Sequence, residues 1–184
     1  GKLTSGVRRV GPEFNYDLVI VDCFATGHAL ALLRAPVGML EAIPAGPMGK
    51  NCREILAVLI DRNLTKYVLV TLLEELPVVE VLELSESLKG EFNAIPLVIA
   101  NRVQELPFVN TRKDTNLVLS AIAEQSHKDT SIVQFIDFLR AIFEKQEGYL
   151  NQLKNLEVVA CLPQVFARNK ADLLEVLGGS LRKI

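Results

Sequence analysis

The sequence predicts an α/β fold in three layers, in which helices flank a mostly parallel sheet. Short apolar runs of strand length alternate along the chain with longer segments whose apolar residues recur at helical spacing. Such alternation favours parallel strands joined by right-handed helical crossovers. The chain has 184 residues, of which 49% are hydrophobic and 23% charged. We therefore expect residues 1–184 to form a single domain around one sizeable core.

Four strands are expected in this sheet, at residues 18–21, 67–71, 96–103 and 157–162. The first run reads Leu-Val-Ile-Val and is apolar at every position, which suits a strand buried on both faces. In parallel sheets, ligands bind beyond the carboxyl ends of the strands. The residues that follow each run are therefore the first candidates for a functional site.

Helices are expected after Thr26, over residues 51–62, around residues 78–84 and over residues 170–181, the last with its apolar residues packed inward. Residues 115–153 predict two core helices, broken around residues 127–130. Residues 34–50 contain several prolines and glycines, so an irregular loop is expected there.

The first strand ends in Asp22 and is followed by a Thr-Gly-His turn that leads into a helix. A carboxylate at that position can hold a water molecule bound to Mg²⁺, and Thr26 and Gly27 can meet a phosphate oxygen near the helix N-terminus. Helix capping by the same residues is the alternative, because Asp and Thr are common at strand-to-helix turns.

The segment resembles the second switch of the arsenite-pump, or anion-transporting, ATPase family, whose pattern reads Asp-Thr-Ala-Pro-Thr-Gly-His-Thr before a short helix. Asp22, Thr26, Gly27 and His28 match this pattern, whereas Cys23, Phe24, Ala25 and Ala29 differ from it. The resemblance implies that the four matching residues sense Mg²⁺ and the γ-phosphate of ATP. For His28, a backbone hydrogen bond at the start of the helix is an equal alternative.

Further matches follow in the family's order over residues 16–181. Residues 68–71 with Glu74 resemble the family's strand and Thr-x-Pro-Glu turn, and residues 96–103 resemble its Val-Val-Asn-Arg-Val strand. The resemblance implies that Asn101 reads adenine and that Pro163 flanks the base. A carboxamide suits that role, because it can accept from the exocyclic amine and donate to a ring nitrogen. Without the family context, Asn101 reads better as a turn residue that ends a strand.

No Gly-rich phosphate loop with its lysine precedes Asp22, and residues 1–4 and 46–51 are poor candidates for one. The resemblance therefore implies an incomplete P-loop NTPase-like domain, the C-terminal portion of an ATPase that cannot hydrolyse ATP alone. It also places the strand of that loop between the first two strands seen here. We expect the flanking strands to close up, another chain to supply the strand, or the chain to associate through the exposed edge.

The function implied by the resemblance is a nucleotide switch that uses ATP and Mg²⁺, closes as a homodimer and releases an unknown protein or anion client. The departures from the pattern leave open a degenerate, non-hydrolysing module of the same fold, which acts in interaction or regulation.

Composition bears on the other function classes. A net charge of −2 without a basic block argues against a nucleic-acid partner, and no apolar segment is long enough to span a bilayer. Cys23, Cys52 and Cys161 are widely spaced and odd in number. This pattern favours buried thiols in a reducing cytoplasm over a disulfide framework or a metal site.

Overall fold

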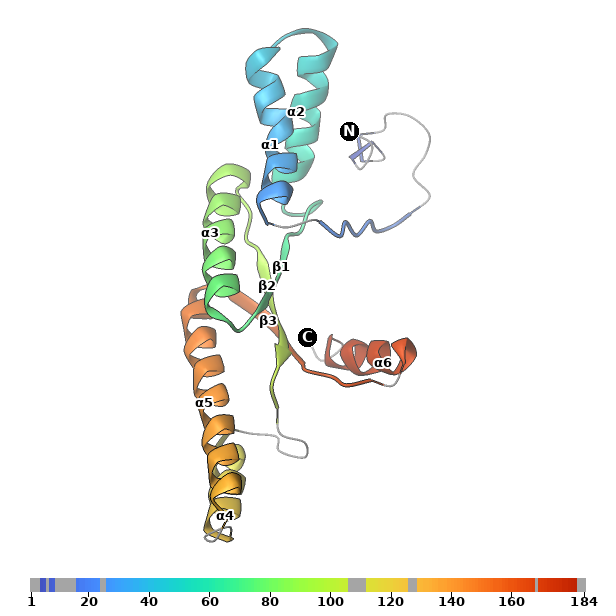
Figure 1. Ribbon diagram of the computed structural model, residues 1–184. Coiled ribbons are helices and arrows are strands. Elements are labelled where there is room, and N and C mark those ends of the chain that lie inside the picture. The colour runs from blue at the N-terminus through green and yellow to red at the C-terminus, as the bar shows by residue number, and fades with distance from the viewer. Residues whose placement is uncertain are drawn as a thin grey trace. The chain divides into compact units, whose positions relative to one another are not determined.

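The computed structural model describes residues 4–5, 7–8, 16–23, 26–105, 112–125, 129–167 and 169–181 (Figure 1). The fold is mixed α/β and contains a three-stranded parallel sheet flanked by helices. The chain divides into two compact units. Unit 1 comprises Gly1–Tyr67 and Glu83–Pro96, and unit 2 comprises Val68–Leu82 and Leu97–Ile184. The single domain expected for residues 1–184 stays a prediction.

Unit 2 contains the sheet, whose strands are β1 (Val68–Leu72), β2 (Leu97–Val103) and β3 (Glu157–Pro163). They lie in the order β1-β2-β3, and both pairs are parallel. These strands confirm the second, third and fourth predicted runs. The central strand β2 alternates in burial, and Val98 and Ala100 are fully buried, which fits its position between two neighbours.

The helices of unit 2 are α4 (Arg112–Gln125), α5 (Thr130–Gln152), α6 (Lys170–Leu181) and the start of α3 (Glu75–Phe92). A short 3₁₀ turn, η2 (Leu153–Asn155), links α5 to β3. Asp129 caps α5, because its side chain accepts a hydrogen bond from the Ser131 backbone N–H at 2.9 Å. The predicted break between the helices of residues 115–153 is therefore confirmed.

Unit 1 contains α1 (Thr26–Ala42), α2 (Gly46–Ile60) and the end of α3. In the α3 part of this unit, Leu88 and Phe92 are buried. The ring of Tyr67 lies 6.4 Å from the ring of Phe92. The Arg34 guanidinium of α1 pairs with the Glu91 carboxylate of α3 and lowers the pKa of that carboxyl.

The irregular loop expected over residues 34–50 is wrong. Helix α1 continues to Ala42 with Pro36 inside it, and α2 begins at Gly46. Pro47 lies in the first turn of α2, where a backbone N–H has no intrahelical partner, so proline costs little there. Packing of α1 along α2 offsets the penalty of the proline inside α1.

The strand predicted at residues 18–21 is also wrong. These residues have no regular secondary structure, and Leu18 and Ile20 are 75% and 84% exposed. A strand needs a neighbour for its backbone hydrogen bonds, and among the described residues the sheet consists of β1, β2 and β3. The first expectation for the missing strand, closure of its two neighbours against each other, is therefore contradicted.

Several residues predicted to be buried are exposed. No residue of α6 is buried, and Leu174 is 62% exposed, so the inward packing expected for this helix is wrong. Cys52 is buried, but Cys23 and Cys161 are exposed. Apolar periodicity identified the helices correctly, but it does not fix how completely a helix is covered.

Candidate functional site

Unit 2 has a cavity of about 540 Å³ where β1 and β2 end. It is lined by Leu72, Leu73, Glu74, Glu75, Asn101, Arg102, Gln104, Ile142, Lys145, Gln146, Tyr149 and Gln164. The carboxyl ends of parallel strands, the turn after β1 and one side of α5 thus meet around a single space. Its volume falls in the range of about 300–1,000 Å³ that is typical of small-molecule sites.

Strand β2 carries an irregularity at the cavity. Ala100 aligns with Cys161 and Val103 with Pro163, so β2 has one more residue than β3 between these pairs. Arg102 has a φ of 54°, in the left-handed region that non-glycine residues seldom adopt. The Asn101 side-chain oxygen accepts from the Arg102 backbone N–H at 2.9 Å. Bulges re-aim side chains beside functional sites, and strained backbone gathers there as well.

The residues that follow the bulge are held by two other elements. Gln146 of α5 accepts from the Gln104 backbone N–H at 2.7 Å through Oε1, and its Nε2 donates to the Gln104 carbonyl at 3.2 Å. The Gln164 backbone N–H donates to the Val103 carbonyl at 2.8 Å. These three bonds fix the end of β2 to α5 and to the segment after β3.

The cavity is lined by charges of both signs. Arg102 and Lys145 are cationic, and Glu74 and Glu75 are anionic. Within the described part of the chain, none of the four forms an ion pair. With the carboxamides of Asn101, Gln104 and Gln164, this lining suits a ligand that has a polar, hydrogen-bonding edge.

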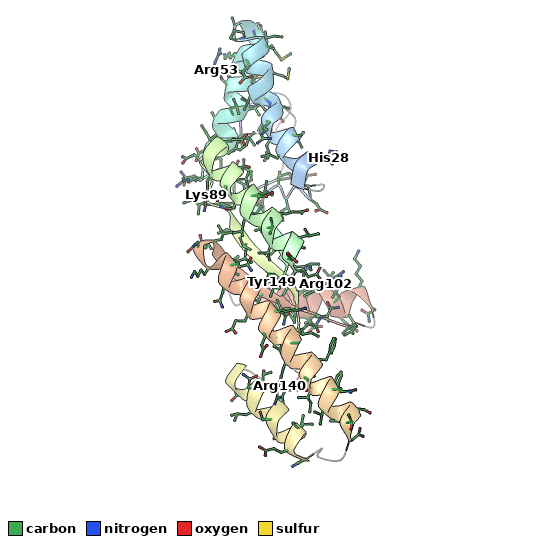
Figure 2. The ribbon with its side chains drawn as sticks, turned by 60° about the vertical axis from the view of Figure 1, so that its left-hand side comes forward. His28, Arg53, Lys89, Arg102, Arg140 and Tyr149 are labelled. Carbon is green, nitrogen blue, oxygen red and sulfur yellow. The ribbon has the colours of Figure 1, made fainter. Side chains whose placement is uncertain are left out.

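An aromatic face is also present. Tyr149 of α5 is half-buried and lines the cavity together with Arg102. Figure 2 labels Tyr149 on α5 and Arg102 at the sheet. Leu72, Leu73 and Ile142 add apolar surface. The cavity therefore combines flat, apolar and hydrogen-bonding surfaces.

On β3, close to this end of the sheet, Cys161 has a thiol whose pKa is raised by partial burial and, to a smaller degree, by the Glu105 carboxylate. The residue as a whole is exposed. A raised pKa disfavours the thiolate at neutral pH, so Cys161 is not an activated nucleophile.

Two of the residues predicted to bind a ligand lie at this end of the sheet. Asn101 lines the cavity, and its carboxamide nitrogen has no hydrogen-bond partner among the described residues. Pro163 ends β3, pairs in register with Val103 and precedes Gln164, which lines the cavity. The roles assigned to Asn101 and Pro163 stay predictions.

The residues predicted to sense phosphate lie in unit 1. Asp22 is exposed in the segment without regular structure, so it does not end a strand as expected. Thr26 begins α1, and Gly27 and His28 follow in its first turn with exposed side-chain positions (Figure 2). A Cβ on Gly27 would meet nothing within 4 Å, so no packing in the structure requires glycine there.

Metal ligands are sparse. Within the described ranges, no group of three or more His, Cys, Asp or Glu residues could hold a metal ion. Asp22 therefore belongs to no such group in the part of the chain that the structure describes.

Comparison with known proteins gives no family for this chain. No protein-family model matches it, and neither does any curated protein. The resemblance to the arsenite-pump family therefore stays a hypothesis that rests on the matching residues. In addition, none of the described helices is long and apolar enough to cross a membrane.

Sequence reasoning missed most of the cavity. Tyr149 was expected in the core stripe of its helix, yet it is only partly buried and lines the cavity. Gln104 and Gln146 are 42 residues apart, and no local pattern links them. Arg102 was considered only within residues 96–103, which resemble the family's strand. The match at its neighbour Asn101 could have indicated Arg102 as a further candidate.

Proposed function

We propose that unit 2 binds the base of an adenine nucleotide, and that the chain is the base-binding portion of an ATP-dependent nucleotide switch of the anion-transporting ATPase family. The observation that supports this most directly is the position of Asn101 in a cavity at the carboxyl ends of parallel strands. The three-layer, P-loop NTPase-like architecture, the homodimer and the protein or anion client belong to the same proposal.

The available hydrogen bonds favour a purine edge. The Asn101 oxygen accepts one backbone bond and has a second lone pair, while its nitrogen can still donate. Adenine offers a ring nitrogen as acceptor and an exocyclic amine as donor at adjacent positions. Asn101 can therefore meet both groups without giving up its bond to Arg102.

Hydrolysis is not expected of this chain. Phosphoryl transfer depends on amides and cations placed around the γ-phosphate, and the sequence contains no Gly-rich phosphate loop. Asp22 and Thr26 would contribute to Mg²⁺ and phosphate contacts only where such a loop is supplied. In this chain, adenosine, AMP and Mg-ATP should consequently bind with similar affinity, since the base carries the contact.

Calorimetric titration of adenosine, AMP and Mg-ATP tests the proposal. At about 0.3 kcal/mol for each of the roughly 19 non-hydrogen atoms of adenosine, a Kd on the order of 100 µM is expected. Asn101→Asp keeps the oxygen that accepts from Arg102 but removes the amide donor, so it should weaken binding about tenfold.

The matched control is Asn151→Asp, which makes the same change at an exposed position on α5 that does not line the cavity. It should bind adenosine as the wild-type chain does. If none of the three ligands binds, or if both variants bind adenosine equally well, the proposal is wrong.

A second function is favoured by one observation. Residues 18–21 are exposed and form no strand, so Asp22 does not end one, as in a degenerate module that acts by interaction rather than catalysis. Supplying the chain with the family's phosphate loop distinguishes the two. A switch would then gain Mg²⁺-dependent turnover, whereas a degenerate module would bind nucleotide without hydrolysis.

A further inference from the structure

We infer that Arg102 and Tyr149 form a stacking surface for the flat face of the ligand, and that the bulge in β2 exists to present Arg102 there. This inference rests on the proposed function and goes beyond it, because it assigns two binding residues and a physical role to a strained backbone position. The ligand class is a planar heteroaromatic ring, such as a purine.

The backbone at Arg102 is strained. A non-glycine residue at a φ of 54° costs free energy unless the surrounding structure holds it in place. Here the Asn101 side chain bonds the Arg102 N–H on one side, and Gln146 bonds both backbone groups of Gln104 on the other. Because these bonds hold the strained backbone beside the cavity, we infer that its role is to place the Arg102 side chain there.

The side chains of Arg102 and Tyr149 are both suited to stacking. Both line the same cavity, Arg102 from β2 and Tyr149 from α5 (Figure 2). A guanidinium is planar and stacks on aromatic faces, and a phenol ring does the same. Neither side chain makes a hydrogen bond or ion pair to another described residue that would hold it away from a ligand.

Asn101 and the stacking surface would contact different parts of the ligand ring. Asn101 reads the polar edge of the ring under the proposed function, and the stacking surface holds its face. Stacking hardly depends on the ring's substituents, because every base has a π-face. Arg102 and Tyr149 should therefore support adenosine and inosine equally, whereas Asn101 should favour adenosine.

The test is a calorimetric comparison of adenosine, inosine and Mg-ATP on the full chain and four variants. Tyr149→Leu should weaken both nucleosides about tenfold or more, and Tyr149→Phe should leave them within about twofold. Arg102→Ala and Arg102→Gly should each weaken both nucleosides about fivefold or more.

Thermal melting separates binding from structure at Arg102. Glycine tolerates the left-handed conformation and alanine does not, so the Gly variant should melt above the Ala variant. We expect the Gly variant to bind as weakly as the Ala variant in spite of its higher melting temperature. If Arg102→Gly binds adenosine as the wild-type chain does, the residue serves only the backbone and the inference is overturned.

Other outcomes distinguish this inference from the proposed function. If Asn101→Asp loses adenosine while the Arg102 and Tyr149 variants keep it, the stacking surface is wrong and the base site stands. If both nucleosides depend on Arg102 and Tyr149 but not on Asn101, the stacking surface stands and the adenine contact is wrong. A loss in the Arg102 variants confined to Mg-ATP would place the guanidinium on the phosphates and overturn the stacking role.

Discussion

At the scale of single residues, Tyr67 links the chain just before β1 to α2. Its hydroxyl donates to the Leu59 carbonyl at 3.0 Å, and partial burial raises the pKa of the phenol above its ordinary value of 10.0. Burial favours the neutral phenol, which is the form that can donate this bond. The contact ties the connection between α2 and β1 in place.

Tyr67→Phe is expected to lower the free energy of unfolding by about 1 kcal/mol at pH 7, because it removes one partly buried hydrogen bond. The contribution of Tyr67 to the free energy of unfolding should fall at alkaline pH. The folded pKa lies above the unfolded one, so the tyrosine's contribution is complete below about pH 10 and falls as the pH rises toward the folded pKa. Urea titrations from pH 7 to 11 should show a smaller alkaline loss in the Phe variant. Identical pH profiles would contradict this assignment.

At the scale of elements, the turn between α1 and α2 depends on one glycine. A Cβ on Gly49 would lie 2.7 Å from the Pro44 carbonyl oxygen and 2.8 Å from that of Ile43. Backbone atoms at that distance cannot move aside cheaply. The close approach explains why the short connection of residues 43–45 accommodates two helices.

Gly49→Ala should therefore destabilise the chain by about 1–3 kcal/mol, since the turn must open to admit the methyl group. Gly38→Ala, in the exposed part of α1, is the matched control. Its Cβ would meet nothing within 4 Å, and the substitution should raise the free energy of unfolding by about 0.5–1 kcal/mol. Chemical denaturation measures both values. A Gly49 variant as stable as the Gly38 variant would show that the turn is not tight.

The join between α5 and β2 depends on Gln146. Gln146→Ala removes both bonds to the Gln104 backbone and should cost about 1–2 kcal/mol, because water can reach the groups left behind. Gln152→Ala changes an exposed glutamine on the same helix and should cost much less. If Gln146 also positions the bulge, its Ala variant should bind adenosine more weakly than the Gln152 variant. Equal stability and equal affinity of the two variants would contradict that role.

At the scale of the whole molecule, the sequence was informative wherever an element's partners lie close by in the chain. The runs that became β1, β2 and β3 and the two helices of residues 115–153 were predicted correctly, because their apolar spacing reflects a real core. Residues 34–50 were misread because proline and glycine weigh heavily in a local pattern. Tertiary packing of α1 on α2 decided that segment instead.

Residues 18–21 show that a favourable composition alone does not produce a strand. Their composition predicts a strand as strongly as any run in the chain, yet they are exposed and unpaired. Composition specifies a strand only when a neighbouring strand is available. Strand β1 is an edge of the sheet, and Val68 and Val70 on it are 49% and 59% exposed. That another chain supplies a further strand, or that the chain associates through an exposed edge, stays a prediction.

Some residues of the candidate site could be predicted from the sequence, and others could not. Asn101 and Pro163 could be selected from the sequence because both match the family's pattern, and both lie near the carboxyl ends of their strands. The bulge, the Gln146 bonds and the position of Tyr149 depend on contacts between distant residues, so no local pattern indicates them.

The measurement that tests the central claim most directly is a map of backbone amide chemical shifts by nuclear magnetic resonance while adenosine is titrated into the full chain. We predict saturable shifts concentrated at residues 101–104, 145–149 and 163–164, around the cavity of unit 2. Absence of shifts at millimolar adenosine, or shifts confined to residues elsewhere, would contradict the account.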